Sequence, residues 1–404
     1  MEPIFTPEEL AQVHAYARPH YIWLAIRDVV SLLVFLGILR FGVRPMYRLA
    51  DRAAGWINAR AERMRRVPVV RALPAALDRL WGGAGWGAAL LFSVLYLLLL
   101  ELIYLPRDIY FTYFLEHAFG MSNDTPGEYA VDELKSLALQ IVANSFLAFG
   151  MYGLMRRLKA WWLVLGVVAG SALLFSAMLD PWRGQIYFEQ HSLPAGPLRE
   201  RIDRLMAKAH IEYGDVVVEK TSRVSKSVNA YFAGQGPTRT IVLTDTLMEN
   251  FTPDEIAAVV AHEAGHIHEP RTLRRILSAV GLLAFLFGVD RVLRLAARRQ
   301  WFGASGFADI RTLPLIGLLL WAVITVGHPF SIADSRARER AADAWALELT
   351  RDPDAFRRML VKATRINKFD PDPPKWVEVL GFNHPTIRER LDFVAAFAEK
   401  TRGE

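Results

Sequence analysis

Six long apolar segments limit this 404-residue chain to one broad class of fold. Each segment approaches the roughly 20 residues that a helix needs to cross a lipid bilayer. The segments are Tyr21–Leu39, Gly85–Leu105, Leu137–Leu154, Trp161–Leu179, Ile276–Leu295 and Leu313–Phe330. A buried helix of a soluble protein can produce one such segment but rarely six. We therefore expect an integral, multi-pass, mainly α-helical membrane protein.

The composition agrees with a membrane protein and narrows its partners. Hydrophobic residues make up 52% of the chain and charged residues only 22%. The chain has no cysteine, which excludes disulfides and zinc sites built from cysteine. Its net charge of +6 could indicate nucleic-acid binding, but the arginines concentrate beside the apolar segments, where they set membrane topology. We expect a lipid bilayer among the partners and no nucleic acid.

The apolar segments alternate with two polar stretches. We divide the chain into residues 1–182 with four spanning helices, 183–272, 273–330 with the fifth and sixth spanning helices, and 331–404. In the first polar stretch, Asp215–Glu219 and Thr240–Thr244 are rich in valine and isoleucine and are typical of short strands. Ser227–Gly234 suits a strand that ends in a turn, whereas the second polar stretch has the pattern of helices.

A helix with both ends marked is predicted over Pro253–Glu269. Thr252 and Glu255 have the spacing of a capping box, and proline is favoured at the first helical position. Pro270 cannot continue a helix without losing a hydrogen bond. This helix carries the run His-Glu-Ala-Gly-His at residues 262–266.

On a helix, this run has the spacing of a zinc site. His262 and His266 are one turn apart, so both imidazoles can reach one ion. Glu263 projects beside them, where it can take a proton from a zinc-bound water. His268 points elsewhere because of its spacing, and we expect it to be a polar flank.

Two histidines leave a catalytic zinc one protein ligand short. The helical stretch Ser335–Asp343 offers Glu339 as that ligand, with Asp343 one turn later to accept the free ring N–H of a ligating histidine. His384 precedes a helix expected to run to about Lys400. It could donate a hydrogen bond to the oxyanion formed when water attacks a peptide carbonyl. Arg390 could orient Asp343 or neutralise the acidic cluster.

Together these motifs resemble the CAAX prenyl protease I family, the membrane zinc endopeptidases that process prenylated proteins. The chain is more distantly similar to the HtpX quality-control proteases. The matching residues lie in Leu105–Pro106, Phe114–Gly120, Asp132–Lys135, Asn229–Tyr231, Ile241–Asp245, His262–His266, Ser335–Asp343 and Asn383–Arg390. The resemblance extends from about residue 90 to the end of the chain, and the Phe114–Gly120 stretch favours the prenyl protease branch over HtpX.

The resemblance implies a fold and a metal. The fold is an α-helical membrane barrel around a large chamber, joined to a zincin-type metallopeptidase domain with a small β-sheet. One Zn²⁺ per chain would be held by His262, His266 and Glu339, with Glu263 as the general base. The two polar stretches would then be two parts of the peptidase domain.

The resemblance also implies a substrate and the residues that meet it. His384 and Arg390 would support the transition state. Asn229 and Ala230 would pair with an extended peptide by strand addition, which forms main-chain hydrogen bonds and tolerates varied side chains. The substrate would be a membrane-associated or lipidated peptide of CAAX type.

Three other functions stay open at this stage. The first is broad degradation of misfolded membrane proteins, as in HtpX. The second is a membrane scaffold that retains a zinc site but no activity, although Glu263 and the zinc ligands are all present. The third is a pore or transporter, which Arg27, Asp28 and other charges in the apolar segments suggest.

The orientation in the membrane, which we take to be a bacterial inner membrane, rests on two opposing arguments. The family usually has seven spanning segments, and its zinc site faces the cytosol. Residues 44–80, however, hold nine arginines, whereas residues 106–136 on the opposite side hold one arginine and one lysine against six acidic residues. The positive-inside rule then places the peptidase domain outside the cytoplasm, although Arg271, Arg274 and Arg275 weaken that argument. The charge pattern slightly favours the non-cytoplasmic side.

Overall fold

The computed structural model describes residues 4–63, 81, 85–172, 188–269 and 271–402. Within these ranges, five helices are long and apolar enough to cross a membrane. They cover Pro7–Arg60, Trp86–Ala118, Pro126–Arg157, Leu273–Arg298 and Ile310–Thr350. Five of the six predicted apolar segments lie in these helices. The other one begins with a shorter apolar helix, Trp161–Ala172, and continues beyond the described residues.

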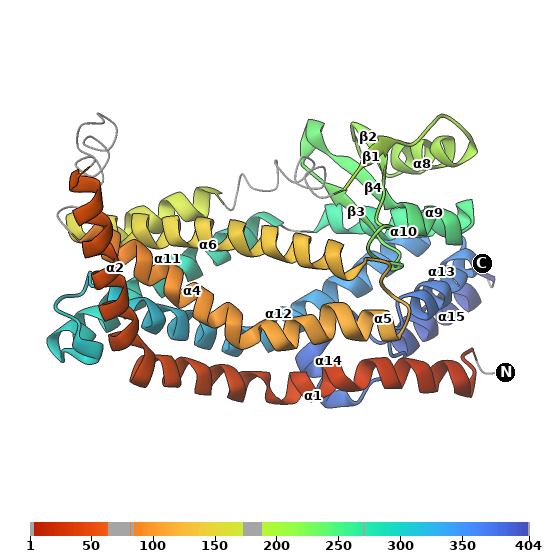
Figure 1. The fold of residues 1–404 in the computed structure, drawn as a ribbon. Coiled ribbons are helices and arrows are strands. Elements are labelled where there is room, and N and C mark those ends of the chain that lie inside the picture. The colour runs from red at the N-terminus through yellow and green to blue at the C-terminus, as the bar shows by residue number, and fades with distance from the viewer. Residues whose placement is uncertain (1–3, 64–80, 82–84, 173–187, 270, 403–404) are drawn as a thin grey trace.

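The first helix runs along the length of the molecule, and the second lies at one end of it (Figure 1). Helix α1 (Pro7–Gly37) continues through a π-helical turn at Ile38–Gly42 into α2 (Val43–Arg63). Part of the arginine-rich connection is therefore helical. Helix α2 has an apolar face that stabilises it. Val43 and Ala50 on this face are buried in a core that includes Phe92 of α4 (Trp86–Ile109). Five of the nine arginines used for the topology argument lie on α2, and the other four fall in residues 64–80, outside the described residues.

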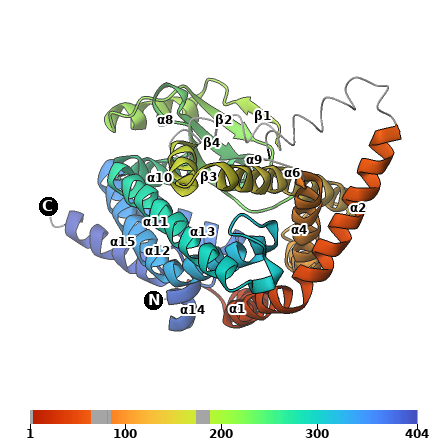
Figure 2. The same ribbon diagram turned by 90° about the vertical axis from the view of Figure 1, so that its left-hand side faces the viewer.

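The remaining long helices complete a ring. The α4 helix leads through a π-helical turn at Tyr110–Leu115 into α5 (Glu116–Ala118), and α6 (Pro126–Arg157) follows. Helix α11 (Arg271–Arg298) and helix α12 (Leu313–Thr350) come later in the chain. Viewed from the α2 end, α1, α4, α6, α11 and α12 surround a common axis (Figure 2). This arrangement is the predicted helical barrel.

A small mixed sheet lies at the opposite end of the long helices from α2 (Figure 1). Its strands are β1 (Gln190–Ser192), β2 (Asp215–Glu219), β3 (Ala230–Ala233) and β4 (Thr240–Thr244), in the spatial order β1-β2-β4-β3. Strands β2 and β4 are parallel, with Asp215 opposite Thr240, and both outer strands are antiparallel to their neighbours. The bounds of β2 and β4 are those predicted from the sequence.

Helices surround this sheet and share one core with it. They are α8 (Pro197–Lys208), α9 (Asp245–Asn250), α10 (Pro253–Gly265), α13 (Pro353–Ile366) and α15 (Ile387–Arg402), whereas α14 (Lys375–Gly381) packs against α1 and α12. Residues such as Ile202, Leu243 and Phe356 are fully buried in this core.

Helix α12 connects the membrane region to the polar region without a break. Its 38 residues include the whole sixth apolar segment and the predicted helix at residues 335–343. The predicted boundary at residue 330 therefore lies inside a single helix. Glu339 is nine residues beyond Phe330, which at about 1.5 Å per residue is roughly 14 Å along the helix axis.

Candidate active site

Helix α10 begins with the capping box that the sequence predicts but ends earlier than expected. The Thr252 N–H donates to Glu255 Oε2 at 2.9 Å, and the Glu255 N–H donates to Thr252 Oγ1 at 3.4 Å. The α-helical bonding stops at Gly265, and His266–His268 form a 3₁₀ turn. Glu269 is extended, with φ −64° and ψ 145°, the conformation that a following proline favours. The predicted end at Glu269 is therefore wrong, because Pro270 acts on the residues before it.

A glycine allows α10 and α12 to approach closely. A Cβ atom built on Gly265 would lie 2.9 Å from Ala342 Cα and 3.2 Å from its carbonyl oxygen. Atoms in a packed interior do not approach so closely without a shift. Gly265 is itself part of the run at residues 262–266. Its close contact with α12 therefore positions His262 and His266 against Glu339.

Three predicted ligands lie together at this helix crossing. His262 Nε2 is 3.1 Å from Glu339 Oε2, and His266 Nε2 is 3.5 Å from Glu339 Oε1. Ligand atoms of His262, Glu263 and His266 also lie within 4.8 Å of one another. Around a tetrahedral zinc ion with ligands at about 2.0–2.1 Å, neighbouring ligand atoms are roughly 3.3 Å apart. The observed separations agree with that spacing.

In the part of the chain that the structure describes, one carboxylate oxygen at this crossing lacks the hydrogen bonds that a buried polar atom needs. Glu339 Oε2 is buried, and His262 Nε2 and His384 Nδ1 lie 3.1 and 2.8 Å away. Neither contact has hydrogen-bond geometry, so this oxygen has no hydrogen-bond partner among the described residues. Buried carboxylate oxygens normally have a partner. Two imidazoles and an unsatisfied carboxylate therefore fit a divalent metal ion of the zinc type.

Behind His262 lies a carboxylate held by an arginine. His262 Nδ1 is 2.8 Å from Asp343 Oδ1, although the contact is not aligned as a hydrogen bond. Arg390 donates to both oxygens of Asp343, from Nε at 2.8 Å and from Nη2 at 2.7 Å. The Arg390 side chain is only 11% exposed, so its charge is neutralised at Asp343 rather than offered to a substrate.

Behind His266 lies a second carboxylate, which we did not predict. His266 Nδ1 is 2.6 Å from Glu269 Oε1. Arg274 of α11 donates to Glu269 Oε2 at 2.8 Å, and Arg338 of α12 lies 3.4 Å from the same oxygen. Such a contact fixes the orientation of a ligating ring. In a 3₁₀ turn, residues three apart lie on the same side, so the sequence could have indicated Glu269 as the partner of His266 if this turn had been predicted.

Glu263 and His384 lie next to the predicted ligands. Burial raises the pKa of the Glu263 carboxyl above its usual range, and the neighbouring His262 and His266 lower it. Half of the His384 side chain is exposed while its Nδ1 is close to Glu339. His384 is therefore more accessible than Arg390, the other side chain expected to support the transition state.

The predicted substrate strand is an outer strand of the sheet. The Thr244 N–H donates to the carbonyl of Asn229 at 3.1 Å, and the Asn229 N–H donates to Thr244 Oγ1 at 3.0 Å. The main chain of Asn229 thus faces β4. Because successive residues of a strand alternate, the main-chain groups of Ala230 and Phe232 face the outer edge.

The long helices, the mixed sheet and the cluster at residues 262–266 together define a membrane metalloprotease. The chain belongs to peptidase family M48, whose profile matches residues 192–398. A second profile, described as the CAAX prenyl protease N-terminal region with five membrane helices, matches residues 1–182. The family and the enzyme class predicted from the sequence are confirmed.

Individual relatives agree with this assignment. The chain is 28% identical over 310 residues to the uncharacterized metalloprotease YhfN of Bacillus subtilis, covering 73% of this chain and 70% of that protein. It is 30% identical over 300 residues to a CAAX prenyl protease 1 homolog of Oryza sativa, covering 71% and 68%. The crystal structure of S. mikatae Ste24p superposes with a TM-score of 0.70, covering 96% of this chain and all of that chain at 19% identity. That superposition supports the fold.

Proposed function

We propose that this protein is a zinc-dependent endopeptidase that hydrolyses peptide bonds of membrane-associated or lipidated substrates of CAAX type. The continuity of α12 carries the proposal. One helix holds both the apolar segment ending at Phe330 and the candidate ligand Glu339, roughly 14 Å further along its axis. A catalytic centre so close to an apolar segment suits a substrate that is itself anchored to the membrane.

His262, His266 and Glu339 are the proposed zinc ligands. Their mutual spacing and the unsatisfied Glu339 Oε2 support this assignment. When bound, the zinc ion would polarise the peptide carbonyl and the attacking water. Asp343 and Glu269 would hold the two rings from behind, each kept in place by arginine.

The remaining chemistry belongs to side chains of this chain. Glu263 would accept a proton from the attacking water and deliver it to the leaving amide nitrogen as the C–N bond breaks. His384 would donate a hydrogen bond to the carbonyl oxygen as negative charge develops there. Arg390 would act through Asp343, because its guanidinium is buried against that carboxylate.

The outer edge of β3 is the proposed docking strand for an extended peptide. The main-chain groups of Ala230 are oriented for pairing, whereas those of Asn229 already bond to Thr244. The Asn229 side chain remains as a possible contact with the substrate. Strand addition of this kind binds the peptide main chain and leaves side chains to be selected elsewhere.

The proposed substrate class predicts a preference for lipidated peptides. In zinc-loaded full-length protein, a farnesylated peptide should be cleaved with kcat/KM at least about tenfold above the same peptide without the lipid. Burial of two methylene groups alone is worth that factor. The measurement is cleavage of matched peptides followed by mass spectrometry. Equal cleavage of both peptides would contradict a CAAX-type substrate and favour the HtpX-like role on misfolded membrane proteins.

The division into domains and the sidedness are further parts of the proposal. Residues 1–182 and 273–330 would form the membrane domain, and residues 183–272 and 331–404 the peptidase domain of a bacterial inner-membrane protein.

Figure 1 draws α2 and the sheet at opposite ends of the long helices. The C-terminal ends of α6 and α11, with Arg157 and Arg298, lie at the α2 end. The positive-inside rule then favours an α2 end in the cytoplasm.

Cysteine labelling tests the sidedness, because the chain has no cysteine of its own. Arg52→Cys on α2 and Glu200→Cys on α8 place single thiols at exposed positions at the two ends. A membrane-impermeant thiol reagent added to intact cells should label position 200 and leave position 52 unlabelled. Lysis should expose both thiols. Labelling of position 52 alone in intact cells would reverse the orientation and agree with a cytosolic zinc site.

A further inference from the structure

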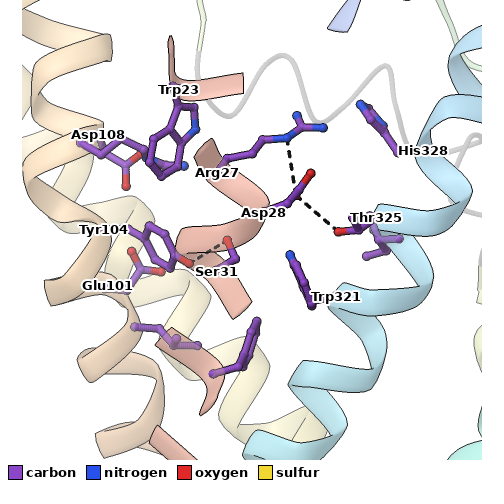
Figure 3. A pocket seen from close by; sticks show the side chains of 14 residues that line it. Trp23, Arg27, Asp28, Ser31, Glu101, Tyr104, Asp108, Trp321, Thr325 and His328 are labelled. Carbon is purple, nitrogen blue, oxygen red and sulfur yellow. Dashed lines mark hydrogen bonds and ion pairs between the residues drawn. The ribbon is translucent and has the colours of Figure 1, made fainter. Parts of the chain in front are cut away.

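A cavity of about 500 Å³ with charged residues in its lining lies between α1, α4 and α12, which belong to the helices that can span a membrane (Figure 3). Five charged side chains line it: Arg27, Asp28, Glu101, Arg107 and Asp108. At one end the three helices touch, because a Cβ on Gly317 would lie 2.5 Å from Tyr96 Oη and 3.0 Å from the Phe35 ring. Charges at membrane depth are costly unless they face a partner or a wet cavity, and they commonly mark functional sites.

Four of the five charges are already paired. Arg27 Nε lies 3.6 Å from Asp28 Oδ1, and Arg107 forms an ion pair with Asp108. The Arg107 guanidinium is also held over the Trp23 ring, 5.3 Å from its centroid.

Glu101 is the charge that remains. It lies beside Tyr104 on the α4 side of the cavity, while the Tyr104 hydroxyl donates to Ser31 (Figure 3). Among the described residues, no hydrogen bond or ion pair reaches the Glu101 carboxylate. The five charged side chains comprise three carboxylates and two guanidinium groups, so one negative charge in the lining is uncompensated.

We propose that this cavity is a subsite for a positively charged side chain, lysine or arginine, of a bound peptide. One free carboxylate is a poor site for calcium, which takes six to eight oxygen ligands. The Trp321 ring in the lining favours an organic cation, which gains from contact with an aromatic ring, whereas the Tyr104 ring already lies under the Arg107 guanidinium at 5.2 Å. An ammonium or guanidinium group would balance the charge of Glu101.

The position of the cavity predicts which residue of the peptide would fill it. Thr325 and His328 precede Glu339 on α12 by 14 and 11 residues, which is about 21 and 16 Å along the helix. An extended peptide covers about 3.3 Å per residue. The cation would therefore belong to a residue roughly five or six positions from the cleaved bond. This step rests on the proposed peptidase function and adds a specificity determinant to it.

A lysine scan of the substrate tests the subsite. A host peptide that zinc-loaded full-length protein cleaves at one bond is given lysine or its uncharged isostere norleucine at successive positions on each side of that bond. At one position about five or six residues away, lysine should lower KM about tenfold relative to norleucine, with kcat unchanged. Glu101→Gln should abolish this difference while leaving the kinetics of the norleucine peptide as they are.

Glu133→Gln is the matched control. Glu133 lies on α6 and lines a neighbouring, mostly apolar cavity that Glu101 also borders, but it does not line this one. The lysine preference should survive in that variant. The proposal is overturned if lysine gives no advantage at any position, if Glu101→Gln keeps the preference, or if Glu133→Gln alone removes it. Failure of wild-type protein to cleave any peptide would instead refute the proposed function, and the two failures are thereby distinguished.

Discussion

The variant Glu263→Gln is expected to lose between about 10²- and 10⁴-fold in kcat while it keeps its zinc. A positioned general base contributes that much to a hydrolytic reaction. Glutamine has the shape of glutamate but cannot accept a proton from water. Because Glu263 is not one of the three proposed ligands, metal content should stay at one zinc per chain. The measurements are cleavage of a peptide panel and metal analysis of the same purified protein.

A surface glutamate provides the control for this substitution. Glu249 on α9 is exposed and, within the described ranges, forms no hydrogen bond or ion pair with the proposed ligands or with Glu263, so Glu249→Gln should retain full activity. Unchanged hydrolysis by Glu263→Gln would refute the mechanism. Loss of zinc from that variant would assign Glu263 to the metal site instead. The non-catalytic scaffold that the sequence left open predicts instead that the wild-type protein itself does not hydrolyse any peptide of the panel.

Much of the fold follows from short-range patterns in the sequence. Strands β2 and β4 are runs of branched residues, and their observed bounds match the prediction. The start of α10 is encoded in Thr252 and Glu255, whose side chains and main chain bond to each other within one turn. Interactions of this length depend only on neighbouring residues, which is why they can be predicted from one sequence.

The end of α10 and the contacts of Glu269 could not be predicted in this way. The switch from α-helix to 3₁₀ turn at His266 places the Glu269 carboxylate near the ring, and two arginines from α11 and α12 hold it there. Arg274 is five residues from Glu269, but Arg338 is 69 residues away from it. The pairing of Glu269 with Arg274 and Arg338 depends on how α10, α11 and α12 cross. Residue spacing in the sequence does not determine that crossing.

The charges of the membrane helices illustrate the same limit. From the sequence, Arg27, Asp28 and Glu101 belonged to the charges in the apolar segments that suggest a pore or transporter. The structure places them in one cavity and pairs Arg27 with Asp28, but gives Glu101 no close partner among the described residues. Which charge is left over depends on the relative rotation of α1, α4 and α12, and this determines the candidate subsite.

The close approach of α10 and α12 leads to the second large expected effect. Gly265→Ala should reduce kcat/KM by about 10²-fold and weaken zinc binding by about 10- to 100-fold. The added Cβ would lie 2.9 Å from Ala342 Cα, a main-chain atom that cannot rotate away. The two helices must then separate by a large fraction of an ångström, and displacements of that size at a catalytic centre have effects of this order.

Two further variants distinguish this effect from a general cost of replacing glycine. Gly281→Ala on α11 makes the same chemical change where nothing lies within 4 Å of the new Cβ, and it should leave activity unchanged. Ala342→Gly in the Gly265→Ala background removes a Cβ at 3.2 Å but leaves the main chain at 2.9 Å, so recovery should be partial. A double-mutant cycle over these two positions measures their coupling. If Gly265→Ala and Gly281→Ala bind zinc and cleave peptide equally well, the spacing of α10 and α12 is not what positions His262 and His266 against Glu339.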